Sequence, residues 1–297
     1  MNKKRRVRAL MKTRFMVGTS GFGIGRARYV QTFDCVEVQH TFYQPPKIAT
    51  LERWREEAPP DFEFVLKAWQ LITHDAKSPT YRRLERQLSE REKQEAGYFR
   101  PTAIVNEAWE VTLACAKALQ ARTILFQCPA SFKQTDENVA NLEAFFKNIH
   151  RSVGANQSIP LAENFAEGRT RRSAPTSPVE KAKSLVEKAE FNFCWEPRGD
   201  WDPKVVRRIC DDLNLCHVVD PFQSVSVTPQ KLYFRLHGKG GWRYEYDEVE
   251  LRELARMLRG AGKSLKRKGV AAYVFFNNAR MTEDAQRFRA ILEEVSR

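Results

Sequence analysis

Residues 62–68, FEFVLKA, carry apolar side chains at every second position. Side chains on a β-strand point alternately to its two faces, so Phe64 and Leu66 share one face and Lys67 lies on the other. A strand in a sheet that is covered by helices turns its apolar set toward those helices. The pattern therefore predicts a strand here, with Lys67 pointing away from the covering helices.

Similar β-rich runs recur outward from this stretch. They are FMVGTS from Phe15, FDCVEV from Phe33, TILFQ from Thr123, FNFCWE from Phe191, LCHVVD from Leu215, KLYFRLH from Lys231 and VAAYVFF from Val270. Amphipathic segments lie between them, including residues 108–120, 137–150, 203–213 and 248–258. Alternating strands and helices predict a parallel sheet, and eight strands predict its closure. We therefore expect an α/β protein with a single TIM-like (β/α)8 barrel over residues 15–297.

Two stretches interrupt this alternation. Residues 81–99, YRRLERQLSEREKQEAGYF, alternate in charge, which is typical of a solvated helix, with a lid over the barrel mouth as the other interpretation. Residues 152–177 are rich in Ser, Pro, Gly and Arg. We expect them to form a long flexible loop after the fourth barrel unit rather than a domain boundary.

The composition indicates a soluble protein. Its 297 residues are 42% hydrophobic, enough for a sizeable core, and no apolar run approaches the ~18 residues that a membrane span needs. The six cysteines show neither C-x-x-C nor zinc-ribbon spacing, so we expect buried, reduced thiols. A cytoplasmic location and no membrane partner follow, whereas the sequence leaves the oligomeric state open.

The net charge of +13 is unevenly placed. Residues 1–14, MNKKRRVRALMKTR, hold seven Lys or Arg and no acid, and we define them as a basic N-terminal arm. The arm lacks the apolar region of a signal peptide. It is a solvated tail, a nucleic-acid-binding arm or a transit-type sequence.

Strand periodicity predicts that a set of polar side chains points into the barrel interior. The set is Glu37, Lys67, Gln127, Glu196, Arg235, His237 and either Asn277 or Asn278. Most of them stand at the C-terminal ends of their strands, where barrel enzymes assemble their active sites. The alternative is a purely structural ion network in which Glu37, Lys67, Glu196 and Arg235 neutralise one another.

Polar and aromatic neighbours favour a ligand pocket over a closed network. His40, Tyr43 and Gln44 follow the second strand, Trp69 and His74 the third, and Arg198 and Trp201 the fifth. Among the histidines, His237 is the preferred functional candidate because its strand also supplies Arg235. His150 and His217 are assigned structural roles.

Several motifs resemble one known family, the YecE-like barrels, also called domain of unknown function 72. They are GTSGF at Gly18, VEVQHTFYQPP at Val36, FEFVLKAWQLITH at Phe62, FQCPASF at Phe126, WEPRGDW at Trp195, YFRLHG at Tyr233 and FFNN at Phe275. The resemblance spans nearly the whole chain after the basic arm. It implies a TIM-like barrel with a pocket of unknown chemistry and kinship to sugar-isomerase and apurinic-endonuclease barrels. His40, Pro197, Gly199 and the loop from Ser152 depart from the family pattern, which leaves specificity open.

We expect an enzyme, a hydrolase or lyase, acting on a phosphate- or sugar-containing substrate or on damaged nucleic acid. The expected partner is thus a phosphorylated small molecule or a nucleic acid. The predicted catalytic residues are Lys67, Glu196, His237, His74 and Glu37. The predicted substrate- and phosphate-binding residues are Arg198, Arg235, Tyr43, Trp201, Gln127, Asn277, Asn278 and Ser20. The alternative is a non-catalytic module that binds nucleic acid or an anion with the same basic rim.

Two more specific forms of the enzyme hypothesis remain open, a Schiff-base mechanism and a metal site. Lys67 among apolar walls and beside Arg235 could lose its proton and form a Schiff base with an aldehyde, although a nearby glutamate would keep it charged. No cofactor is predicted, yet Glu37, His40, His74, Glu196, Asp220 and His237 are residue types that bind divalent metals. Lys67 and Arg235 would repel such a cation. The glycine-rich GTSGFGIG after the first strand lacks P-loop spacing and is expected to bind at most an anion through backbone amides.

Overall fold

The computed structural model describes residues 14–155, 191–262 and 271–295. Its strands are β1 (Arg14–Thr19), β2 (Cys35–Val38), β3 (Glu63–Lys67), β4 (Thr123–Gln127), β5 (Asn192–Glu196), β6 (Cys216–Val219), β7 (Tyr233–Leu236) and β8 (Ala271–Phe276). Each coincides with one of the β-rich runs predicted from the sequence.

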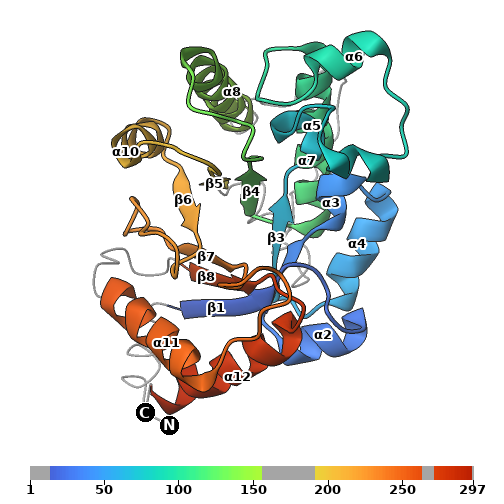
Figure 1. The fold of residues 1–297 in the computed structure, drawn as a ribbon. Coiled ribbons are helices and arrows are strands. Elements are labelled where there is room, and N and C mark those ends of the chain that lie inside the picture. Colours follow the sequence, from blue (N-terminus) through green and yellow to red (C-terminus); the bar gives the residue numbers. More distant parts are fainter. Residues whose placement is uncertain (1–13, 156–190, 263–270, 296–297) are drawn as a thin grey trace, which may run out of the picture.

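The helices surround the strands as a ring (Figure 1). They are α2 (Arg26–Thr32), α3 (His40–Tyr43), α4 (Ile48–Glu57), α5 (Gln70–Thr73), the 3₁₀ helix η1 (Pro79–Arg83), α6 (Glu90–Glu95), α7 (Ala103–Leu119), α8 (Asp136–Ala155), α10 (Pro203–Asp212), α11 (Glu248–Gly262) and α12 (Met281–Glu294). The four helices predicted by periodicity are α7, α8, α10 and α11, and the observed helices extend beyond the expected bounds of three of them.

The sheet is parallel and nearly closed. Its strand order is β1-β8-β7-β6-β5-β4-β3-β2, and β1 meets β2 through a bridge between Ser20 and Glu37. A Cβ atom on Gly18 would lie 2.4 Å from the Cys35 carbonyl oxygen, so only glycine lets the two strands approach this closely. Eight parallel strands with helices outside confirm the predicted TIM-like barrel.

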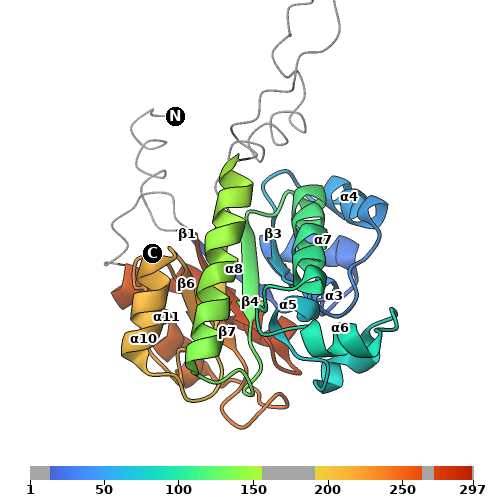
Figure 2. The same ribbon diagram turned by 90° about the horizontal axis from the view of Figure 1, so that it is seen from above.

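Apolar side chains fill both sides of the barrel wall. Between strands and helices, Phe126 of β4 contacts Phe145 and Phe146 of α8, which Figure 2 shows lying along β4. Inside the barrel a second cluster is formed by Met16, Cys35, Val65, Leu125, Cys194, Cys216, Val218, Tyr233, Tyr273 and Phe275. This cluster closes the interior below the C-terminal ends of the strands, so the polar side chains above it stand on an apolar floor.

The charged stretch that interrupts the alternation of strands and helices differs in part from the prediction. Residues 81–99 do not form one helix but contribute to η1 and form α6, whose Ser89 and Glu92 make a capping box. The charges of this stretch pair both within the segment, as Arg86 does with Glu92, and with α7, as Arg86 does with Glu107 at 2.7 Å. Residues 84–89 form neither helix nor strand and separate η1 from α6. After α6, Gly97 takes a positive φ of 78° and its amide donates to the Leu71 carbonyl, which ties the end of the segment to α5.

The other predicted segments lie mainly outside the described residues. The loop expected over residues 152–177 begins as the last turn of α8, and its remainder falls within the undescribed residues 156–190. Of the basic arm only Arg14 is described, and it begins β1. All six cysteines are buried, and the described part of the chain contains no disulfide. No helix among the described residues is both long and apolar enough to cross a membrane.

Candidate functional site

A pocket of about 980 Å³ opens at the C-terminal ends of the strands. Lys67, Gln127 and Glu196 are the last residues of β3, β4 and β5, and His237 directly follows β7. Nine of the predicted site residues line it: Tyr43, Lys67, His74, Gln127, Glu196, Arg198, Arg235, His237 and Asn277. Side chains from distant parts of the chain therefore meet where the barrel architecture places its active sites.

Arg235 links two glutamates in the interior. Its Nε and Nη2 lie 2.9 and 2.8 Å from the two carboxylate oxygens of Glu37, and its Nη1 lies 2.6 Å from Glu196 Oε2. The Arg235 side chain is 1% exposed. Burial by itself lowers the pKa of Arg235, but the two glutamates outweigh it and raise the pKa. The guanidinium is committed to these carboxylates, which corrects the expectation that it clamps a phosphate.

Glu37 is the buried anchor of this network. Its Oε2 also accepts a 2.5 Å hydrogen bond from the Tyr233 hydroxyl, and Gln39 Nε2 donates to Oε1. The side chain is fully buried and does not line the pocket. The catalytic role predicted for Glu37 is thus corrected to one of positioning Arg235, because its carboxylate is buried and outside the pocket lining. Three of the four groups in the predicted structural network are therefore connected, because Arg235 pairs with both Glu37 and Glu196.

Glu196 presents its second oxygen to the pocket. Oε1 lies 3.1 Å from Arg198 Nε and 3.2 Å from His237 Nε2. Burial on its own raises the pKa of Glu196, but Arg235, His237 and Arg198 together outweigh burial and hold the pKa well below its ordinary value. Glu196 is therefore a carboxylate at neutral pH, in contact with an imidazole.

His237 is held through its backbone N–H and both of its ring nitrogens. Its backbone N–H donates to Asp220 Oδ2 at 3.0 Å, and its Nδ1 lies 3.0 Å from Asn277 Nδ2. Its Nε2 also lies 3.2 Å from Arg198 Nη2. After it, Gly238 takes a φ of 85°, and a Cβ there would lie 2.4 Å from the Gly241 carbonyl oxygen. The His-Gly pair thus turns the chain sharply while the ring stays fixed at the pocket wall.

Lys67 is the one member of the predicted network that stays outside it. Its Nζ lies 3.7 Å from the centroid of the Phe42 ring, and within the described residues it makes no hydrogen bond or ion pair. Lys67 as a whole is 5% exposed, and its backbone carbonyl accepts a 2.7 Å hydrogen bond from Thr41 Oγ1. Burial lowers the pKa of Lys67 to about 7, Arg235 adds to the fall, and Glu37 and Glu196 oppose it.

His74 faces the same pocket as an uncharged ring. Its Nδ1 lies 2.8 Å from Thr73 Oγ1, and its ring meets the Phe42 ring edge-on at 4.9 Å between centroids. Burial, followed by the nearby charges of Lys67 and Arg198, lowers the pKa of His74 to about 3. The ring is therefore neutral at physiological pH and a weak base.

Three predicted binding residues lie away from the pocket. The Trp201 indole donates to the Phe132 carbonyl at 3.1 Å and packs against Trp195. The Asn278 amide donates to the Tyr244 carbonyl and to Asp284. These assignments are corrected: Trp201 belongs to the turn before α10, where Asp202 caps the helix, and Asn278 to the packing of α12.

Ser20, the third, is used by the barrel itself. Its backbone N–H donates to Phe276 and that of Gly21 to Glu37, so these two amides of the glycine-rich loop are unavailable to an anion. Its hydroxyl lies 3.5 Å from Arg235 Nη2. The predicted substrate contact is therefore corrected to a contact that supports the buried arginine.

Four further residues line the pocket: His217, Asp220, Lys239 and Trp242. His217 was expected to be structural and Asp220 was considered only as a metal ligand, whereas Lys239 and Trp242 were overlooked. Lys239 and Trp242 follow β7 in a loop without strand or helix periodicity, so only the GKGGW composition could have marked them. His217 Nδ1 accepts a 3.1 Å hydrogen bond from the Val227 backbone, and burial lowers its pKa to about 4.

The side chains considered as metal ligands do not form a metal-binding cluster. Among the described residues no group of three His, Cys, Asp or Glu side chains is placed to hold a metal ion. Glu196 and His237 do meet, but Arg198 and Arg235 occupy the remaining directions around the carboxylate. Two cations at this distance would repel a third.

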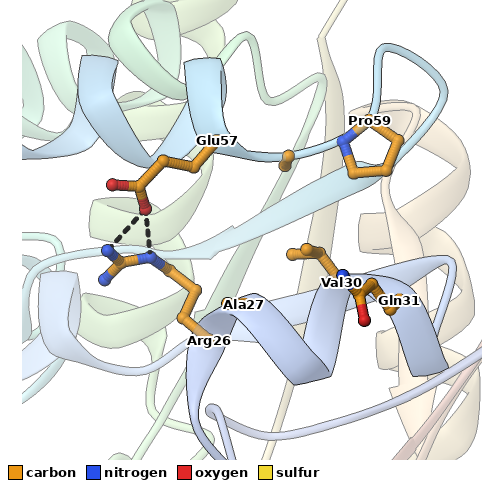
Figure 3. A pocket seen from close by; sticks show the side chains of 7 residues that line it. Arg26, Ala27, Val30, Gln31, Glu57 and Pro59 are labelled. Carbon is orange, nitrogen blue, oxygen red and sulfur yellow. Dashed lines mark hydrogen bonds and ion pairs between the residues drawn. The ribbon is translucent and has the colours of Figure 1, made fainter.

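A second pocket, of about 480 Å³, lies between α2 and the end of α4 (Figure 3). Its one ion pair joins Arg26 to Glu57 at 2.6 Å, and Val30, Ala58 and Pro59 contribute apolar surface. No residue predicted from the sequence to act in catalysis or binding lies there. The paired charges and the distance from the strand ends favour the larger pocket as the functional site.

Comparison with known proteins gives a family. Residues 25–297 match the family described as "Protein of unknown function DUF72". A DUF72 family protein of Enterococcus faecalis has a similar solved structure, with 19% identity, 95% of this chain and 99% of that chain covered, and a TM-score of 0.61. One of Thermotoga maritima has 19% identity, 94% and 99% coverage and a TM-score of 0.60. No curated protein matches the sequence.

Proposed function

This chain belongs to the DUF72 family, as its motifs predict, and from that premise we propose that its barrel is an enzyme acting on a sugar- or phosphate-containing substrate. The observation that carries the proposal is the contact between Glu196 Oε1 and His237 Nε2, at 3.2 Å in the wall of the large pocket. A carboxylate and an imidazole in contact can pass a proton to and from a bound substrate.

The geometry assigns separate tasks to the two sides of Glu196. Oε2 is fixed by the buried Arg235, so the carboxylate cannot rotate away. Oε1 and His237 face the pocket, where a substrate proton would be transferred. An active site needs a proton-transfer pair that is held rigidly in place. A purely structural ion network does not need such a pair to face a pocket.

Arg198 is the best placed anion-binding group. Its side chain is 41% exposed, whereas that of Arg235 is 1% exposed. Gln127, Asn277 and Tyr43 add hydrogen-bonding groups suited to hydroxyls, and the exposed indole of Trp242 adds a flat apolar face at the rim. A positive charge, several amides and an aromatic ring together fit a phosphorylated sugar. Damaged nucleic acid carries the same chemistry, and the basic arm supports that version of the proposal.

Calorimetric titration with D-ribose 5-phosphate tests the binding half. Arg198→Ala should weaken binding at least tenfold, because it removes a charge-assisted contact worth about 1.5–3 kcal/mol. Arg208→Ala is the matched control: its side chain is 48% exposed and also pairs with a glutamate, but it lies on α10 outside the pocket. Equal loss in both variants, or none in either, would refute a pocket site for the phosphate.

Incubation with a panel of aldose and ketose phosphates in D₂O tests the catalytic half. Proton NMR should detect product or solvent deuterium at carbon for at least one compound, with His237→Ala and Glu196→Gln inactive. If ligands bind through Arg198 and none is altered, the result supports a non-catalytic anion-binding module in place of the enzyme.

A further inference from the structure

Lys67 is a buried amine without a counterion. The lysine stands at the end of β3 in the same pocket as Glu196 and His237. Arg235 pairs with both interior glutamates, and within the described residues the Lys67 ammonium makes no hydrogen bond or ion pair and lies 3.7 Å from the centroid of the Phe42 ring. A charge placed here costs free energy of solvation that no hydrogen bond or ion pair returns. Packing alone would be served better by an apolar residue, so the amine needs a chemical explanation.

We propose that Lys67 is an amine nucleophile that forms a Schiff base with the carbonyl group of a phosphorylated sugar. The inference rests on the proposed function and adds to it the class of substrate carbon attacked and the atom that attacks it. It also favours a lyase over a hydrolase, since a covalent imine is of no use in simple hydrolysis of a phosphate ester.

The step balances without an added oxidant or reductant. The lone pair of the unprotonated Nζ attacks the carbonyl carbon, a C–N bond forms, and the C=O π pair moves to oxygen. The nitrogen gives up its protons, the oxygen gains two and leaves as water, and a C=N bond remains. The Glu196–His237 pair lines the same pocket and can carry the protons.

The surroundings of Lys67 suit this reaction. Burial brings the pKa of its amine to about 7, so at neutral pH it is unprotonated on the order of 1,000 times more often than an ordinary lysine. Once the imine is protonated, the C–H bond on the neighbouring carbon becomes acidic. The Glu196–His237 pair lines the same pocket and is the group placed to accept that proton. Arg198 is positioned to hold the phosphate.

The pocket contains its own control lysine. Lys239 also lines it, but its Nζ lies 2.9 Å from Glu250 Oε1, and a hydrogen bond to Glu250 raises its pKa. The side chain of Lys239 is 40% exposed, so a reagent reaches it more easily than Lys67. Accessibility therefore predicts labelling of Lys239, and the proposed chemistry predicts labelling of Lys67.

Reductive trapping decides between them. The protein is incubated with glyceraldehyde 3-phosphate, whose aldehyde is not locked in a ring, and sodium borohydride reduces any imine to a stable secondary amine. Peptide mass spectrometry should place the adduct on Lys67, with at least tenfold less on Lys239, and labelling should increase between pH 6 and pH 8. Lys67→Met and Lys67→Arg should both abolish it, the latter while keeping the positive charge.

The outcomes separate this inference from the proposed function. An adduct spread over exposed lysines, or equal labelling in Lys67→Arg, overturns the Schiff base. If Lys67 stays unlabelled while ribose 5-phosphate still binds in an Arg198-dependent manner, the sugar-phosphate site stands and the covalent step fails. If neither labelling nor Arg198-dependent binding occurs, both fail.

Discussion

Arg235 Nη1 lies 2.6 Å from Glu196 Oε2, and through this contact a fully buried ion network holds one wall of an open pocket. The far end of the same guanidinium is fixed by Glu37 at 2.8 and 2.9 Å. One arginine thus connects the barrel interior, at the β1–β2 closure, to a carboxylate that lines the pocket.

Arg235→Met should destabilise the protein strongly. The substitution leaves the buried Glu37 without a cation and Glu196 with Arg198 alone, and breaking a buried pair typically costs about 3–5 kcal/mol. Chemical denaturation measures the loss. Arg208→Met, which breaks exposed pairs with Glu143 and Asp212, should cost no more than about 1 kcal/mol. A loss for Arg235→Met no larger than that of the control would show that the network contributes little.

Lys67→Met should stabilise the protein at low pH. The native pKa of about 7 lies below the unfolded value near 10.5, so between these values the unfolded chain binds more protons and stability rises with pH. Below pH 7 the native state bears the cost of a buried charge, on the order of 5 kcal/mol. The variant should therefore be more stable than wild type at pH 6, and the difference should shrink by pH 9. A variant destabilised equally at both pH values would mean that the ammonium is favourably held.

The imidazole of His74 should stay neutral across the physiological range. Its native pKa of about 3 lies below the ordinary value of 6.5, so the unfolded chain binds the extra proton between them. Stability from this group is present above pH 6.5 and is lost as pH falls toward 3. Nitrogen-detected NMR of the imidazole should show no protonation between pH 5 and pH 8. A titration midpoint near 6.5 would contradict the burial of this ring and its contact with Phe42.

Alternation within strands made the fold and half of the pocket predictable. Lys67, Glu196 and Arg235 each follow an inward apolar residue by two positions, so a period of two placed them inside once the strands were recognised. Segment 81–99 was harder, because its charges suit one continuous helix, whereas residues 84–89 interrupt it and Gly97 and Tyr98, both with positive φ, follow the end of α6.

Pairing within the site could not be read from the sequence. Periodicity placed Glu37, Lys67, Glu196 and Arg235 on one face but gave no distances, and the choice between a four-member network and a free lysine depends on distances alone. The geometry leaves Lys67 out because Arg235 has enough donors for both glutamates. Trp201 was misplaced and Trp242 overlooked for a related reason: loop residues have no periodicity to show which way they point.

The most direct test is a crystal structure of the protein soaked with D-ribose 5-phosphate. We predict density for the sugar phosphate in the pocket at the strand ends, with the phosphate on Arg198 and the sugar between Lys67 and His237. Clear density only in the second pocket, beside Arg26 and Glu57, would contradict the account. So would a pocket that stays empty at saturating ligand while Arg198 remains on Glu196.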